Sequence, residues 1–136
     1  MATTPITASF LKETAKSVYI ALCNKPRPES LVDLPLFQKH LSPEFKLYHD
    51  SKLLPDGGGR DAFLALWSKM ASSMPDLHME IRDAVAEVED ADEGNGRVWL
   101  YSKITGLHGG VEKLSVDMMK FEKGVLVEVV DLQRTL

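Results

Sequence analysis

The hydrophobic positions of this chain change period along its length. They recur at helical spacing in the first half and alternate in much of the second half. Thr4-Pro5, a cap followed by proline, predicts a first helix that ends near Asn24, before two closely spaced prolines. A second, short helix is predicted over residues 34–41. The third helix is indicated by apolar residues at positions i, i+3, i+4 and i+7, which are Phe63, Leu66, Trp67 and Met70.

Alternating residues predict the strands. A short strand is expected over residues 44–49, and the four long strands are expected over residues 77–88, 97–105, 111–121 and 125–132. Residues 55–59, Pro-Asp-Gly-Gly-Gly, are expected to form a loop or lid. Helices followed by a meander predict one α+β domain over residues 1–136, with three N-terminal helices packed on a curved, mainly antiparallel sheet. A strongly bent sheet covered by helices encloses a cone-shaped pocket, which is the default position for a ligand.

The last two predicted strands carry three carboxylates, and the hairpin loop decides which of them share a face. A three-residue loop, 122–124, places Asp117 and Asp131 on one face. A two-residue loop, 123–124, places Asp117 with Glu128 instead. We favour the three-residue loop, because it needs a left-handed residue only at Gly124, whereas the type I′ turn also forces Lys123 to positive φ. Both strands are apolar on both faces, so some of these acids should point into a space lined by protein.

Composition narrows the classes of partner. The formal net charge is −4, and no basic stripe with interleaved aromatics is present, so neither nucleic acid nor an anionic membrane is an expected partner. Cys23 is the one cysteine, which excludes an internal disulfide and a cysteine-based metal cluster, and it is expected to be a buried, inert thiol. No segment has the length of a membrane span, and the N-terminus lacks the pattern of a secretory signal, so a soluble cytoplasmic protein is expected.

Three stretches of the sequence, in this order, carry a resemblance to a known family. They are FKLYHD at 45–50 with GRDAF at 59–63, ITGLH at 104–108, and SVDMMKFEKGVLVEVVD at 115–131. In these stretches the chain resembles the SnoaL-like polyketide cyclase branch of the nuclear transport factor 2-like (NTF2-like) superfamily. The resemblance covers nearly the whole chain and implies a cone-shaped α+β barrel. Where the family has Asn-Pro and His-Trp, this chain has Asp50-Ser51 and Val129-Val130, and the loss of those polar and aromatic groups makes the expected pocket more apolar.

The resemblance implies that Asp117 faces the cavity and that it transfers protons to and from a carbonyl compound. An apolar pocket disfavours the charged form of an aspartate and raises its pKa toward the operating pH, which suits a general base or acid. Asp131 is the expected partner acid, or Glu128 if the loop has two residues. His49, at the end of the first strand, is the candidate proton shuttle. Asp50 is expected to point the other way, so that it forms no dyad with His49.

The walls of the expected pocket include Trp67, Tyr101 and Met119 as substrate-binding candidates, with core packing as the other role open to Trp67. Trp99 is expected on an outer sheet face that is buried in a homodimer. The remaining histidines show no ligand spacing, and the glycines before residue 60 lack a phosphate-loop pattern, so no metal and no cofactor is expected.

Two functions follow from these expectations. The first is a cofactor-independent isomerase or cyclase that acts by acid–base chemistry on a hydrophobic, polyketide- or terpenoid-like intermediate of secondary metabolism. The second is a non-catalytic module of the same fold that binds a small molecule or dimerises. The acids clustered within the hairpin favour the enzyme.

Overall fold

The structure is a computed structural model that describes residues 4–55 and 58–136. Asp56 and Gly57, in the middle of the predicted loop, lie outside the described residues. The elements in chain order are α1 (Ala8–Cys23), α2 (Pro35–His40), β1 (Leu41–His49), β2 (Lys52–Leu54), α3 (Arg60–Ser72), β3 (His78–Asp90), β4 (Asn95–Thr105), the short 3₁₀ helix η1 (His108–Gly110), β5 (Lys113–Glu122) and β6 (Val125–Thr135). No helix in these two ranges is both long enough and apolar enough to cross a membrane.

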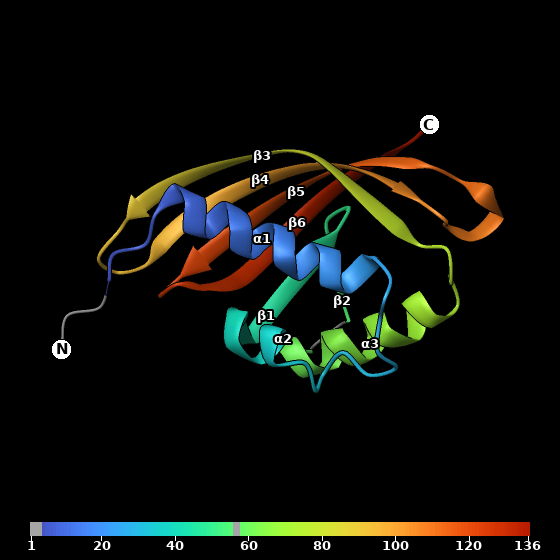
Figure 1. Cartoon of the computed structure of the whole chain (residues 1–136), viewed down its shortest axis with the longest axis horizontal. Helices are drawn as coiled ribbons and strands as arrows, with labels where there is room; N and C mark the ends of the chain where they lie inside the picture. Colours follow the sequence, from blue (N-terminus) through green and yellow to red (C-terminus); the bar gives the residue numbers. More distant parts are fainter. Residues whose placement is uncertain (1–3, 56–57) are drawn as a thin grey trace.

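The six strands form one mixed sheet in the order β2-β1-β6-β5-β4-β3. Neighbouring strands are antiparallel except for β1 and β6, which are parallel. Figure 1 shows the long strands arched over α1, with α2 and α3 on the same side of the sheet, next to β1. The predicted α+β architecture, with three helices on one face of a curved, mainly antiparallel sheet, is therefore confirmed. The parallel β1–β6 pair is the exception within it.

Helix α1 begins later than Thr4-Pro5 predicts. Thr7 is the N-cap, and its side chain accepts a hydrogen bond of 3.0 Å from the Phe10 N–H, so the cap at Thr4 was wrong. At the other end, the Asn24 side chain exchanges two hydrogen bonds with the Met79 backbone, at 3.0 and 2.7 Å. This clamp fixes the C-terminal end of α1 on β3, so that the apolar stripe of the helix faces the sheet.

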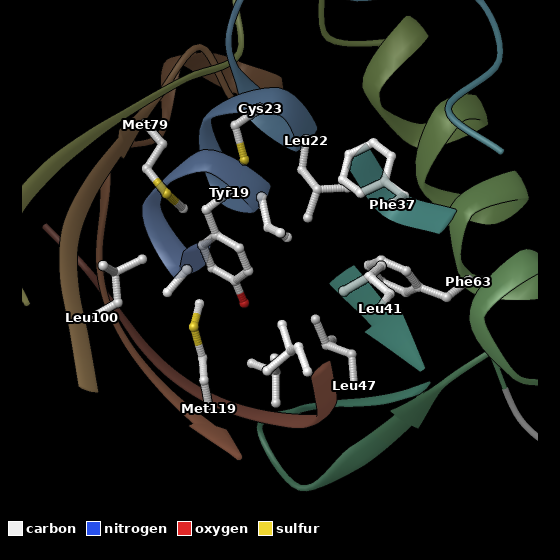
Figure 2. Close-up of a cluster of buried hydrophobic side chains, with 14 of the residues drawn as sticks. Tyr19, Leu22, Cys23, Phe37, Leu41, Leu47, Phe63, Met79, Leu100 and Met119 are labelled. Atoms are coloured by element: carbon white, nitrogen blue, oxygen red, sulfur yellow. The ribbon is translucent and has the colours of Figure 1, made fainter. Parts of the chain in front are cut away.

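The hydrophobic core lies between α1 and the sheet and continues to α3. Phe45 of β1 meets Phe63 of α3 edge-on, with ring centroids 5.1 Å apart. Figure 2 shows Tyr19 of α1 at the centre of this cluster, close to Leu100 and Met119 of the sheet. Burying each large apolar side chain of this kind contributes about 1.5–3 kcal/mol. The ring of Tyr19 therefore belongs to the core, although its hydroxyl still needs a polar partner.

The segment between α2 and α3 differs from the prediction. Strand β1 follows α2 directly and includes Pro43, which is tolerated because the pairing with β6 shifts register between Leu41 and Lys46. The sequence did not predict β2. It folds back on β1 because Asp50 and Ser51 form a tight turn, with φ angles of +46° and +73°.

The terminal hairpin has the two-residue loop, so the three-residue loop was wrong. Lys123 and Gly124 both have positive φ, 53° and 77°, and Glu122 pairs with Val125. The neighbouring β3–β4 turn supports this conformation, because Asn95 Oδ1 accepts from the Lys123 N–H at 3.2 Å and the Gly94 carbonyl accepts from the Gly124 N–H at 2.8 Å.

A bulge in β6 then changes which residues of the two hairpin strands lie opposite each other. Between Lys120 and Phe121 the register shifts by one residue of β6, so that Lys120 pairs with Glu128 while Phe121 pairs with Leu126. As a result Asp117 pairs with Asp131. The two aspartates share the inner face, as predicted, but a two-residue loop and a bulge bring them together.

Candidate active site

A cavity of about 260 Å³ lies between the inner face of the sheet and the helices. Most of its wall is apolar and comes from α1, α3 and the strands. The polar side chains that line it are Tyr19, His49, Ser73, His108, Lys113, Asp117, Asp131 and Gln133. Trp67 also lines the cavity, as predicted, and its indole N–H donates to the Leu22 carbonyl at 2.8 Å. Since that bond satisfies the polar edge of Trp67, its ring acts as apolar wall.

Asp117 is the most deeply buried acid of the cavity, with 2% of its surface exposed. The Tyr19 hydroxyl donates to Asp117 Oδ2 at 2.5 Å, and the Ser115 hydroxyl donates to Oδ1 at 2.7 Å. Burial raises the Asp117 pKa from 3.8 to about 7, and the hydrogen bonds from Tyr19 and Ser115 oppose that rise. The carboxyl group is thus held at both oxygens and can exchange a proton near neutral pH.

Tyr19 and Ser115 were not predicted as site residues. Tyr19 lies 98 positions before Asp117 in the chain and reaches it from the buried face of α1. Burial raises the pKa of Tyr19 well above 10, and the nearby Asp117 carboxylate raises it further, so this phenol remains a hydrogen-bond donor. For Ser115 a signal was present, because it lies two residues before Asp117 and therefore on the same face of the strand.

Asp131 and His49 form the second polar pair. They are partners across the parallel β1–β6 ladder, and His49 Nδ1 lies 2.7 Å from Asp131 Oδ1. Asp131 is 5% exposed, and burial raises its pKa while the hydrogen bond and charge of His49 lower it. The His49 side chain is 36% exposed, so it connects the buried acid with solvent.

The prediction that Asp50 points away from His49 was wrong. His49 Nε2 lies 3.5 Å from Asp50 Oδ2. Alternation of side chains holds only within a strand, and Asp50 lies past the end of β1, in a left-handed turn conformation. The Gln133 N–H donates to Asp50 Oδ1 at 3.3 Å, which ties this turn to β6. His49 consequently lies between two carboxylates.

Three predicted site residues lie outside the cavity lining. Glu128 is on the opposite face of β6 from Asp131, and its cross-strand neighbours in the sheet are Lys120 of β5 and Lys46 of β1. Tyr101 is on the outer face of β4, next to the buried, inward-facing Leu100. Met119 faces inward but is packed in the core, 1% exposed.

Two further groups complete the surroundings of Asp117. Ser102 is fully buried, pairs with Ser115 across β4 and β5, and its hydroxyl has no hydrogen-bond partner within the described part of the chain. Cys23 lines the cavity, and burial raises the pKa of its thiol to about 12, as expected for an inert cysteine. Among residues 4–55 and 58–136, no three His, Cys, Asp or Glu side chains are grouped so as to hold a metal ion.

Comparisons with known proteins identify the family and the fold of the chain. No family model matches the chain. It is 30% identical over 135 residues to the probable cyclase otaY of Aspergillus carbonarius, covering 98% of this chain and 96% of that protein. The fold is similar to that of IdmH from Streptomyces antibioticus, provisionally assigned as a polyketide cyclase, with a TM-score of 0.58, 18% identity and 89% of each chain covered. A protein from Jannaschia sp. CCS1, provisionally assigned as a SnoaL-like polyketide cyclase, has a TM-score of 0.60 and 13% identity, with 93% of this chain and 86% of that chain covered.

Proposed function

Since this chain belongs to the SnoaL-like polyketide cyclase family of the NTF2-like superfamily, we propose that it is a cofactor-independent cyclase or isomerase that works by acid–base chemistry. Its substrate is a hydrophobic, carbonyl-containing intermediate of secondary metabolism, polyketide- or terpenoid-like. The observation that carries this proposal is Asp117, a buried carboxyl group whose pKa of about 7 lets it take and return a proton near neutral pH.

The reaction begins at a carbon next to a carbonyl group. The Asp117 carboxylate removes a proton from that carbon, the electron pair of the broken C–H bond moves into the carbonyl as an enolate, and the enolate then attacks a second electrophilic carbon or is reprotonated elsewhere. Asp117 returns the proton at the end, so the net reaction consumes no cofactor. Tyr19 and Ser115 keep the carboxyl oriented, because each holds one of its oxygens.

Ser102 supports the protonated form of Asp117. In the charged form, Asp117 Oδ1 accepts the hydrogen of Ser115. Once that oxygen carries a proton, Ser115 must become the acceptor and turn its own hydrogen elsewhere. Gln133 Nε2 already donates to Ser115 Oγ, at 3.4 Å, so the hydrogen of Ser115 needs another acceptor. Ser102, its partner across the β4–β5 ladder, has a hydroxyl without a hydrogen bond, and a rotation of the two serine side chains would let that hydroxyl receive the hydrogen. This role would account for a buried hydroxyl that has no hydrogen-bond partner while Asp117 is charged.

His49 and Asp131 serve as the second acid–base pair. Asp131 orients the imidazole through Nδ1, and the partly exposed ring links the cavity with solvent. A proton that leaves one position of the substrate can therefore be replaced at another. Two groups with different surroundings divide the acid and base roles between them.

Proton exchange at a simple ketone tests the proposal without the natural substrate. In D₂O near neutral pH, the wild-type protein should accelerate the loss of the α C–H signals of 2-tetralone, followed by NMR. Asp117→Asn should slow this exchange by about 10²–10⁴-fold. Asp92→Asn, which changes an exposed acid in the β3–β4 turn, is the matched control and should exchange at the wild-type rate.

Binding of 2-tetralone must be measured together with the exchange of its α protons. Ligand-observed NMR should show that the wild type and Asp117→Asn both bind the ketone. If the wild type binds it and does not accelerate exchange, the acid–base proposal fails, and the protein is a binding module with an unreactive cavity.

A further inference from the structure

The polar residues of the cavity fall into two groups. Asp117, Asp131 and Tyr19 are buried at its inner part. Ser73, at the end of α3, and His108, in η1, are exposed and mark its mouth, where Ser73 Oγ lies 3.3 Å from His108 Nε2. These two residues bring the helix layer and the β4–β5 connection together at the rim of the cavity.

The backbone at Gly106 fixes this rim. Gly106 has a φ of +76°, and a Cβ at this position would collide with the carbonyl of Asp76, just before β3. The close approach lets the chain turn back sharply after β4, so that Leu107 and His108 border the cavity. The mouth is therefore a defined part of the fold.

Lys113 is a lysine in the cavity lining, so it places a positive charge there. It is half-buried and pairs with the inward-facing Ile104, so it lies on the same face of β5 as Ser115 and Asp117. Its neighbour Glu112 pairs instead with Lys103, at 3.3 Å. Lys113 forms no ion pair with any carboxylate in the described residues. A half-buried lysine that lines a mainly apolar cavity is thus left without an anionic partner among the described residues.

The distance between Lys113, near the mouth of the cavity, and Asp117, in its inner part, sets the size of a ligand that contacts both. Lys113 and Asp117 are four residues apart on one strand, which corresponds to about 13 Å between their Cα atoms. A flexible lysine side chain covers part of this span. The remaining lining of the cavity is mainly apolar, with Ile104, Leu77 and Met74 among its residues. A ligand that touches both ends therefore has an apolar body of roughly two fused rings or an equivalent chain.

We propose that Lys113 is an anion anchor, and that the substrate is an apolar carbonyl compound that carries a free carboxylate at the end away from its reacting carbon. This inference rests on the proposed function for the identity of the reacting end. Ser73, His108 and Gln133 are the hydrogen-bonding groups of the lining nearest the mouth and the ends of β5 and β6. The reverse orientation is disfavoured, because it would place the carboxylate against Asp117 and Asp131. Charge at the two ends thus decides which carbon of the substrate meets Asp117.

Paired ligands test the anchor by binding alone. The probes are a naphthalene-tipped hexanoic acid and its primary amide, which have nearly the same shape and differ in charge; binding near neutral pH is followed by naphthalene fluorescence. The wild type should bind the acid about tenfold more tightly than the amide, because a lysine ammonium forms a stronger, charge-assisted hydrogen bond with a carboxylate. Lys113→Met should bind the two equally while its affinity for the amide is unchanged, and Lys113→Arg should restore the preference.

Lys120→Met is the matched control, since Lys120 lies on the opposite face of the same strand, near Glu122. Its preference for the acid should equal that of the wild type. Equal binding of acid and amide by the wild type, or an acid preference that survives in Lys113→Met, would overturn the anchor. Either result leaves the exchange of 2-tetralone untouched, because that ketone has no carboxylate, so failure of the anchor and failure of the acid–base proposal are distinguishable.

Discussion

Replacing Asp117 by asparagine should remove a large pH dependence from the stability of this protein. The pKa of the carboxyl group is about 7 in the folded protein and 3.8 as its ordinary value. Between these values the folded state holds a proton that the unfolded state has lost. The stabilising contribution is therefore complete below pH 4 and is lost as the pH rises to the folded pKa. At 1.36 kcal/mol per pK unit, the full contribution is about 4 kcal/mol.

The assay is urea unfolding of the wild type and Asp117→Asn at several pH values from 5 to 8. Over this range the stability advantage of the wild type over the variant should fall by roughly 2–3 kcal/mol as the pH rises. Asp131 also titrates with a raised pKa, because it is buried, but it is present in both proteins and largely cancels in the difference. The free energy of unfolding of Asp92→Asn should change with pH in the same way as that of the wild type.

Two parallel curves for the wild type and Asp117→Asn would refute this reasoning. That result would mean that the Asp117 carboxyl titrates at the same pH in the folded and unfolded protein. The burial of its oxygens would then not raise the pKa, and the main physical argument for an acid–base site would be lost.

Three further outcomes follow from the same structure. Tyr19→Phe should raise the pKa of Asp117 above 7 in a ¹³C NMR titration, because it removes a hydrogen bond to the charged form; an unchanged pKa would contradict this. Ser102→Ala should lower the pKa of Asp117, because the protonated form loses the acceptor that completes its hydrogen bonding, and an unchanged or raised pKa would exclude that role. The wild type should sediment as a homodimer at micromolar concentration, and Trp99→Lys should sediment as a monomer. The reason is that Trp99 and its cross-strand partner Val85 expose 52% and 60% of their surfaces on the outer face of the sheet. A monomeric wild type would disprove the dimer.

The alternation of residues on the strands was informative about the candidate site as well as the fold. It limited Asp117 to sharing a face with either Asp131 or Glu128, and the structure shows the first arrangement. The hairpin loop, however, has two residues, and that loop was predicted to place Asp117 with Glu128. The cost of positive φ at Lys123 was offset by tertiary hydrogen bonds, in which the Gly94 carbonyl and the Asn95 side chain accept from the N–H groups of Gly124 and Lys123 and hold them in a two-residue turn. The bulge in β6 was not readable from the pattern, because an extra residue in an apolar strand leaves no break in composition.

The partners of each acid depend on which elements lie side by side. Tyr19 has the same place in the helical stripe whether its hydroxyl faces a carboxylate or a backbone carbonyl. His49 meets Asp131 only because β1 runs parallel to β6, and it meets Asp50 only because a left-handed turn ends the strand. The contacts Tyr19–Asp117 and His49–Asp131 join residues far apart in the sequence, and the contact of His49 with its neighbour Asp50 depends on the turn conformation, so no spacing predicts them.

By itself the sequence determined the α+β class, the three helices and the apolar character of the strands that carry Asp117. These properties follow from periodicity and residue type, which each segment carries in its own residues. The tertiary structure alone decided the two hydroxyl donors of Asp117, the bulge that sets Asp131 opposite it, and the inward position of Lys113 at the cavity mouth. Those arrangements depend on packing between segments far apart in the chain, and a pattern along one segment shows which side is buried without showing what lies opposite.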